Sequence, residues 1–333
     1  MQRSTASAFV AGLLDAAIVI LCAAVLLALF AAGGCAHAPR TAPPGAPADG
    51  AVERYRAGVA RLVAGHLDDG QVVSRNADGA AAHRGEALIW TWTLIGTLGC
   101  EDGAPLLARA LERLRSNSGA LYRYEPLPDE YVGGNEVSLD GEIGYWYGVA
   151  RRLARCPADR ELLAEAWQLR QAAVDGAGGR LHPNVAQSAY AELSAVRDQV
   201  AYALGLRGEP AADRLEVLGG QLAAWAGAVA AAKAPCYRWN LAWLLVRTLE
   251  AAGRSLPGGG RNAFCAVTAG GDVPTVDHWC GRPGLAEFLA GYVANSWEYR
   301  FQRCGAWEAP DGAGLATPGL DELVALRELY VLD

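Results

Sequence analysis

The chain is a succession of helix-length apolar segments separated by short stretches rich in glycine, proline and aspartate. The expected helices cover residues 52–67, 85–98, 104–114, 138–153, 159–174, 193–206, 211–232, 237–252 and 283–299. Proline and glycine fall between these segments, where helices normally end. Alanine is abundant and alternating Val/Ile/Thr patterns are scarce, which favours helix over sheet. The sequence therefore predicts an all-α fold, and its 333 residues, 52% of them apolar, allow a sizeable core.

Acidic residues recur at a constant spacing in the first helix of three consecutive hairpins. Glu86, Glu142 and Asp198 are separated by 56 residues each. Each is followed by aromatic and small residues, as in WTWTLIGTL, YWYGVARRL and AYALGL. Repeated α-hairpins with a fixed period are typical of helical arrays in which neighbouring units bury a continuous core. The spacing thus predicts three equivalent helices with their acids at the same end.

Small residues mark one of these helices as central. Gly141, Gly144 and Gly148 lie on or near one helical face, which permits close approach of a second helix. In these features the chain resembles the α/α-toroid group of carbohydrate-active enzymes, the six-hairpin glycosidases and related polysaccharide lyases. The resemblance covers residues 51–332 as architecture. It implies repeated α-hairpins that form an α/α toroid or an incomplete barrel, with sugar-handling acids at the mouth of the inner helices.

The connection that begins at Leu121 carries the densest local chemistry. It contains Tyr122, Arg123 and Asn135 and leads into Asp140. A connection of about twenty residues inside a compact helical domain is uncommon and often functional. Aromatic faces stack on sugar rings, and amide, guanidinium and carboxylate groups hydrogen-bond to sugar hydroxyls. We therefore expect a glycan to be handled here.

Glycoside hydrolysis requires two carboxylates, about 5–5.5 Å apart for retention and about 6.5–9.5 Å apart for inversion. Asp140 with any of the three regularly spaced acids would supply such a pair. A lyase requires instead a base near a charge-neutralising group, for which Tyr145 and His278 are candidates. The predicted catalytic residues are Asp140, Glu142, Glu86 and Asp198. The predicted substrate-binding residues are Tyr122, Arg123, Asn135, Tyr145, Trp146, Arg197 and His278.

Each candidate also has a structural explanation that the sequence leaves open. Asp140 follows the good N-cap residue Ser138, so it can favour the positive end of the helix dipole. Glu86 and Glu142 have the same alternative near their helix starts. Asp198 can form an ordinary ion pair with Arg197, and the tryptophans can fill the core.

The first 35 residues predict an export signal or a membrane anchor. An uncharged apolar run from Ala16 to Gly34 precedes Cys35. The sequence Ala32-Gly33-Gly34-Cys35 resembles a bacterial lipobox, although Ala32 stands where that family prefers leucine. The resemblance implies lipid attachment at Cys35 after cleavage, and the alternative is an uncleaved N-terminal helix anchor.

Residues 36–50 predict a Pro/Ala-rich tether, and residues 51–333 a single helical domain. In polyproline II geometry such a tether reaches roughly 40 Å at about 3.1 Å per residue. Both interpretations of the N-terminus place the domain outside the cytoplasm, in the periplasm or at the cell exterior. By resemblance to lipoprotein sorting, Ala36 after the cysteine implies the outer membrane in a Gram-negative host.

Six cysteines follow Cys35, without a CxxC pair and without histidine at metal-ligand spacing. Disulfides in an oxidising compartment are the natural interpretation, and buried free thiols are the alternative. The sequence leaves their connectivity open, since six cysteines allow about fifteen pairings. Cys265 with Cys280 is the most local option, and Cys100 with Cys156 would join two helix ends.

Charge and motifs exclude several classes of function. The net charge of −7 and the absence of a basic stripe argue against a nucleic-acid partner. Phosphate-binding, dinucleotide-binding, zinc-protease and serine-hydrolase motifs are absent from the sequence. We expect no cofactor and no metal. The remaining hypotheses are a glycan hydrolase or lyase of the cell envelope, a non-catalytic lipoprotein that binds a glycan or a partner protein, and a structural envelope component.

Overall fold

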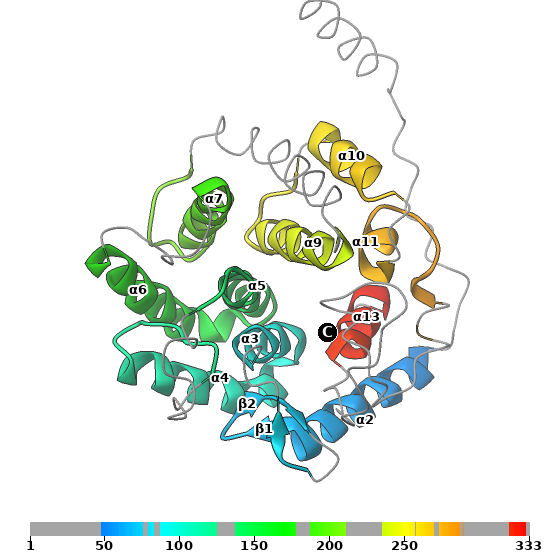
Figure 1. The fold of residues 1–333 in the computed structure, drawn as a ribbon, viewed down its shortest axis with the longest axis horizontal. Coiled ribbons are helices and arrows are strands. Elements are labelled where there is room, and N and C mark those ends of the chain that lie inside the picture. The colour runs from blue at the N-terminus through cyan, green and yellow to red at the C-terminus, as the bar shows by residue number, and fades with distance from the viewer. Residues whose placement is uncertain are drawn as a thin grey trace, which may run out of the picture. The chain divides into compact units, whose positions relative to one another are not determined.

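The described part of the chain is helical almost throughout (Figure 1). The computed structural model describes residues 48–75, 79–82, 87–124, 137–177, 187–210, 235–256, 258–269, 273–286, 289 and 320–330. The chain divides into a unit Met1–Gly45 and a unit Ala46–Asp333, and every described residue belongs to the second. The all-α class predicted from the sequence is confirmed.

Seven of the described helices correspond to predicted segments: α2 (Ala48–His66), α3 (Ala87–Thr97), α4 (Cys100–Ser116), α5 (Leu139–Arg155), α6 (Arg160–Gly176), α7 (Gln187–Ala203) and α9 (Pro235–Ala251). Helices α10 (Gly258–Val267), α11 (Pro274–Trp279) and α13 (Leu320–Tyr330) were not predicted. A 3-10 turn, η3 (Pro157–Asp159), precedes α6. The predicted helix at 211–232 and most of the one at 283–299 lie outside the described residues.

Two short antiparallel ladders interrupt the helices, and the sequence analysis did not anticipate them. They pair β1 (Leu67–Asp68) with β2 (Gln71–Val72) and β3 (Ser74–Arg75) with β4 (Ala81–Ala82). Asp69 and Gly70 form the two-residue turn of the first hairpin, and both have positive φ. An Asp-Gly pair with this backbone is the favoured hairpin turn.

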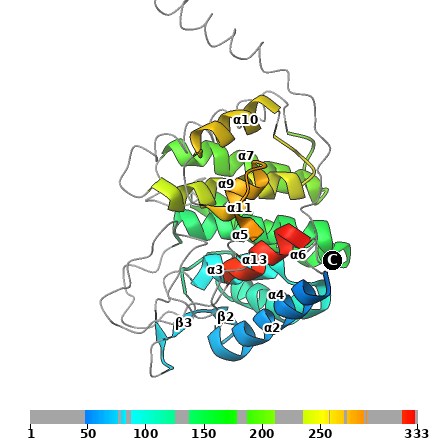
Figure 2. The same ribbon diagram turned by 90° about the vertical axis from the view of Figure 1, so that its right-hand side faces the viewer.

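In the two hairpins α3–α4 and α5–α6, a largely buried helix is followed by one with a partly exposed face. Helix α3 is buried on all sides, because every residue of ALIWTWTLIGT except Leu88 is buried. Helix α4 is amphipathic and buries one leucine-rich stripe, as expected of a covering helix. Figures 1 and 2 show α3 and α5 side by side, with α4 and α6 on their outer sides.

Glycines bring α3 and α5 unusually close. A Cβ atom on Gly148 would lie 2.4 Å from the Trp92 carbonyl oxygen, and one on Gly144 would lie 2.8 Å from the Ile89 Cα. A Cβ atom on Gly141 would instead lie 2.7 Å from Cδ2 of the Leu88 side chain. The predicted close helix approach is therefore confirmed at Gly144 and Gly148, whereas Gly141 meets a side chain.

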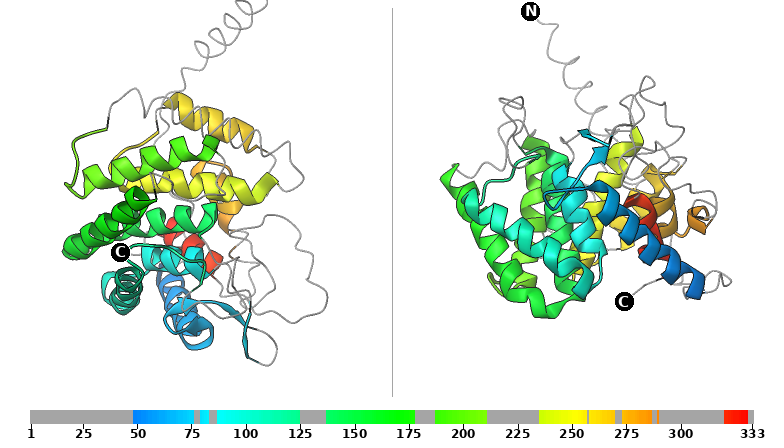
Figure 3. Two further views of the ribbon diagram at one scale, coloured as in Figure 1. Left: turned by 60° about the vertical axis from the view of Figure 1, so that its left-hand side comes forward. Right: turned by 90° about the horizontal axis from the view of Figure 1, so that it is seen from below.

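The remaining helices extend this pair. Helix α9 packs against α5, and α7 packs against both (Figure 3). The last described helix, α13, packs on α2 and α3 and is buried along most of its length. Arg54 and Arg61 of α2 both form ion pairs with Glu322 of α13, whose side chain is only 3% exposed. The first and last described helices are thereby joined.

The two disulfides anticipated from the sequence are both present. Cys100–Cys156 links the start of α4 to the end of α5, and Cys265–Cys280 joins α10 to the residue after α11. Beside the first disulfide, the fully buried Arg152 guanidinium donates to the Gly99 and Cys100 carbonyl oxygens and pairs with Asp159. Arg152 therefore links the end of α5 to the start of α4 by hydrogen bonds, in addition to the disulfide.

Loss of the Cys100–Cys156 disulfide should lower stability without abolishing the fold. The bond closes a separation of 56 residues and Cys265–Cys280 one of 15, so the Cys100→Ser/Cys156→Ser variant should lose about 2–4 kcal/mol and the Cys265→Ser/Cys280→Ser variant less. Urea unfolding followed by circular dichroism measures both losses. An unfolded Cys100→Ser/Cys156→Ser protein would show that Arg152 does not hold the junction.

Candidate functional site

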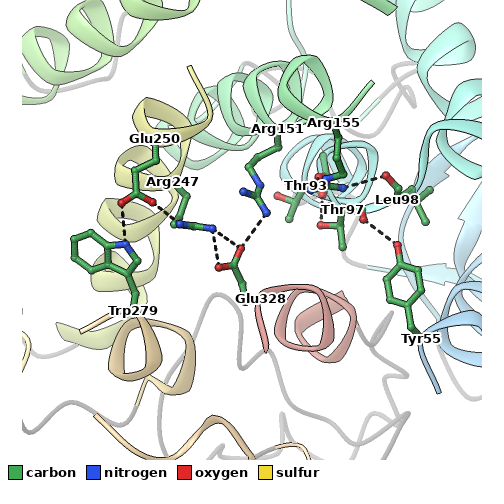
Figure 4. A network of polar contacts seen from close by, with 11 residues as sticks. Tyr55, Thr93, Thr97, Leu98, Arg151, Arg155, Arg247, Glu250, Trp279 and Glu328 are labelled. Atoms are coloured by element: carbon green, nitrogen blue, oxygen red, sulfur yellow. Dashed lines mark hydrogen bonds and ion pairs between the residues drawn. The ribbon is translucent and has the colours of Figure 1, made fainter. Parts of the chain in front are cut away.

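The C-terminal ends of α3, α5 and α9 are occupied by mutually engaged charged groups (Figure 4). Arg151 of α5 and Arg247 of α9 both bind Glu328 of α13, at 3.1 Å and 2.8 Å. Arg247 also pairs with Glu250, which accepts a hydrogen bond from the Trp279 indole at 3.1 Å. Glu250 and Glu328 thus connect α5, α9, α11 and α13.

The end of α3 is covered in the same region. Arg155 donates to the carbonyl oxygens of Gly96 and Leu98, and the Tyr55 hydroxyl donates to the Thr97 carbonyl oxygen at 2.9 Å. Burial and the neighbouring Arg151 lower the pKa of Arg155 to about 10, so it stays protonated at neutral pH. The last carbonyl groups of α3 are therefore satisfied by side chains.

The N-terminal end of α5 carries the first predicted catalytic residue. Ser138 is the N-cap, and its hydroxyl accepts a hydrogen bond from the Gly141 N–H at 3.2 Å, as predicted. Asp140 lies in the first turn and is partly exposed. Because Gly141 packs on Leu88, this turn lies beside the start of α3.

The segment from Leu121 to Tyr124 runs beside the start of α3 as well. The Leu88 N–H donates to the Arg123 carbonyl oxygen at 2.9 Å, and the Tyr124 hydroxyl donates to Asp68 at 2.6 Å. The structure thus brings Tyr122 and Arg123 to the end of the helix pair where Asp140 lies.

A small pocket of about 30 Å³ lies between this segment, α3, α4 and β2. Its apolar lining consists of Leu88, Trp92, Ala110, Leu114, Ala120 and Leu121. Its polar lining consists of Gln71, Thr91, Arg113 and Tyr122. One water-sized group needs roughly 10–15 Å³, so the pocket accepts a substituent rather than a whole sugar ring.

Glu142 is an interior charge. Its side chain is fully buried and is paired with Arg170 of α6, which is also buried. Burial raises the pKa of Glu142 above its usual value, while Arg170 and the more distant Arg197 oppose that rise. Glu142 therefore connects α5 to α6 from within the core.

Tyr145 and Trp146 also lie in the core. The Tyr145 ring makes edge contacts with Trp92 and Trp146, at centroid distances of 4.6 Å and 4.7 Å. The Tyr145 hydroxyl donates to the Ala166 carbonyl oxygen at 2.8 Å, and burial raises its pKa. Both rings pack between helices and are shielded from solvent.

Three predicted site residues lie on helices other than α5. Arg197 and Asp198 are in α7, and His278 is in α11. Asp198 is twelfth in α7 rather than near its start, and it pairs with Arg207 at 3.0 Å and Arg197 at 3.7 Å. His278 is in α11, which packs on α9 and α13. Equal spacing in sequence therefore did not bring Asp198 to a helix start.

Sequence reasoning missed several residues of this region. Gln71 and its hairpin had a local signal, the Asp69-Gly70 turn, which was not used. Arg113 and Arg170 had none, because their partners Asp69 and Glu142 lie 44 and 28 residues away in the chain.

Three predicted residues, Cys35, Glu86 and Asn135, lie outside the described residues. Within the described ranges, no helix is long and apolar enough to cross a bilayer, and no three His, Cys, Asp or Glu side chains are grouped to bind a metal ion. No protein-family model, curated protein or solved structure matches the chain.

Removal of the partner of Glu142 should be costly. In Arg170→Met a buried carboxylate loses its counter-ion, which typically costs about 3–5 kcal/mol of unfolding free energy. The double variant Glu142→Gln/Arg170→Met removes both charges and should recover part of that loss. Urea unfolding of the wild type, Glu142→Gln, Arg170→Met and the double variant measures the coupling energy between the two side chains. Additive effects of the two substitutions would contradict the pairing.

Proposed function

We propose that this chain is an exported, membrane-anchored protein whose helical domain acts on a glycan of the cell envelope as a hydrolase or lyase. The observation that carries the proposal is the grouping at the start of α3 and α5. There Tyr122 lines a pocket beside the first turns of α3, and Asp140 lies in the first turn of the adjacent helix. At the opposite end of these helices the described charges bind one another.

The helix arrangement supports an incomplete α/α toroid. Helices α3 and α5 are inner helices with amphipathic partners α4 and α6 on their outer sides. The disulfide Cys100–Cys156 joins positions that are one 56-residue period apart. We propose that the same alternation continues through α9 and α13, with the sugar-facing mouth at the N-terminal ends of the inner helices.

Location rests on the cysteines and the N-terminus. Two disulfides in the described residues fit an oxidising compartment outside the cytoplasm. We propose lipid attachment at Cys35, a tether over residues 36–50 and, in a Gram-negative host, the outer membrane. An uncleaved N-terminal helix would place the domain in the same compartment.

Two of the four predicted catalytic acids are held in ion pairs, which narrows the choice of residues for glycan cleavage. Glu142 is buried in an ion pair and Asp198 is paired with arginines. We propose Asp140, which is partly exposed in the first turn of α5, as one catalytic carboxylate and Glu86, which immediately precedes α3 in the sequence, as the other. One carboxyl group would protonate the leaving oxygen, and the other would act as nucleophile or activate water.

A non-catalytic glycan- or partner-binding lipoprotein is the second candidate. The observation that favours it is that two of the four predicted catalytic acids already have structural partners. Binding would use the same pocket and the same aromatic and polar side chains.

Asp140→Asn should abolish turnover while leaving the fold intact. Loss of a general acid or base typically lowers the rate about 10²–10⁴-fold. Reducing-sugar release and unsaturated-product formation are measured with the full-length protein in detergent on a panel of envelope polysaccharides. Asp175→Asn on α6 is the matched control, because Asp175 is an exposed aspartate.

The outcomes separate the two candidates. Turnover by the wild type and by Asp175→Asn, lost in a folded Asp140→Asn protein, supports the enzyme. Glycan binding that neither variant alters, without turnover, favours the binding protein. Neither binding nor turnover on the whole panel would contradict both.

A further inference from the structure

The pocket beside α3 has features of a subsite for one small chemical group. Its volume of about 30 Å³ corresponds to about two water-sized groups, since one needs roughly 10–15 Å³. Partly exposed Ala120 and Tyr122 lie on its lining, so the pocket reaches the protein surface. A group of two or three heavy atoms can enter it from a larger ligand outside.

The walls divide the pocket into an apolar and a polar part. Leu88, Trp92 and Leu114 offer aliphatic and aromatic surface suited to a methyl group. The Thr91 hydroxyl accepts a hydrogen bond from the Val72 N–H at 2.9 Å, and its own hydrogen can be donated to a carbonyl oxygen. A ligand that fills both parts must carry a methyl group and an acceptor within a few bonds.

The charge around the pocket favours an uncharged group. Arg113, the cation in the lining, pairs with Asp69 at 3.0 Å. Asp69 also pairs with Arg109 at 2.7 Å, and Arg109 in turn binds Glu112. The two arginines and two carboxylates balance, so no net positive charge is left to recruit an anion.

We propose that this pocket binds an acetyl group, as carried by an N- or O-acetylated sugar. The methyl group would pack against Leu88 and Trp92, and the carbonyl oxygen would accept a hydrogen bond from Thr91. The sugar ring would lie outside the pocket, toward the start of α5 and Asp140. The identification of the ligand as a sugar rests on the proposed function, whereas the acetyl preference rests on the pocket.

Saturation-transfer NMR on the full-length protein in detergent tests the proposal. The probes are N-acetylglucosamine, glucose and free acetamide. We expect saturation to be strongest on the acetyl methyl protons of N-acetylglucosamine and acetamide, and glucose to receive less than N-acetylglucosamine.

Two variants should fill the pocket without removing a polar group. Ala110→Leu adds a side chain from α4, and Ala120→Leu adds one from the partly exposed segment with less risk to folding. Both should lose the methyl saturation. Ala108→Leu, an exposed position on the same helix α4, is the matched control and should retain it.

The outcomes separate the subsite from the proposed function. Methyl saturation that persists in folded Ala110→Leu and Ala120→Leu, or equal binding of glucose and N-acetylglucosamine, would overturn the subsite and leave glycan binding standing. Acetamide binding that both variants abolish, without any glycan turnover or binding, would support the subsite and count against the proposed function. Absence of methyl saturation from both N-acetylglucosamine and acetamide would overturn the subsite.

Discussion

The close contact between α3 and α5 is the constraint on which the rest of the described structure depends. Gly144 and Gly148 meet backbone atoms of Ile89 and Trp92 at distances that leave no room for a side chain. Aromatic rings of both helices border this contact, since a Cβ atom on Gly148 would lie 3.0 Å from the Trp92 ring and one on Gly96 would lie 3.2 Å from the Tyr147 ring. There Trp92, Tyr145 and Trp146 pack edge to face and fill the space toward the neighbouring helices. The same contact places the starts of α3 and α5 side by side, which creates the candidate site.

Charged groups have three roles along this helix pair. At the C-terminal ends, Arg151, Arg155 and Arg247 satisfy helix carbonyls or hold Glu328, as cations at helix C-termini are expected to do. In the first turn of α5, Glu142 forms a buried ion pair with Arg170 that links α5 to α6. Such pairs contribute little net stability but are costly to break. The start of α5 keeps a partly exposed carboxylate, Asp140, and this is where we place the chemistry.

Local sequence signals predicted the helices well and the site only in part. Apolar periodicity and the Pro/Gly breaks located α2 to α6 and α9 within about four residues and α7 within six, but they missed α10, α11 and α13. The glycine spacing predicted the close contact. The N-cap Ser138 followed from a local pattern as well. The two disulfides were among the pairings that the sequence left open. The partners of buried charges did not follow from local patterns, because Arg170 reaches Glu142 only after a hairpin has folded. The pocket was equally invisible, since four separate segments form its walls.

The most direct test of this account is the unfolding free energy of Gly144→Ala. A methyl group forced against the Ile89 backbone should lower that free energy by about 1–3 kcal/mol, the usual cost of overpacking a filled interior. Gly65→Ala is the control, because no atom lies within 4 Å of the added methyl on α2. That control should be unchanged or more stable by up to about 1 kcal/mol. If urea unfolding finds the two variants alike, α3 and α5 are not in backbone contact and the account of the site built on that contact is wrong.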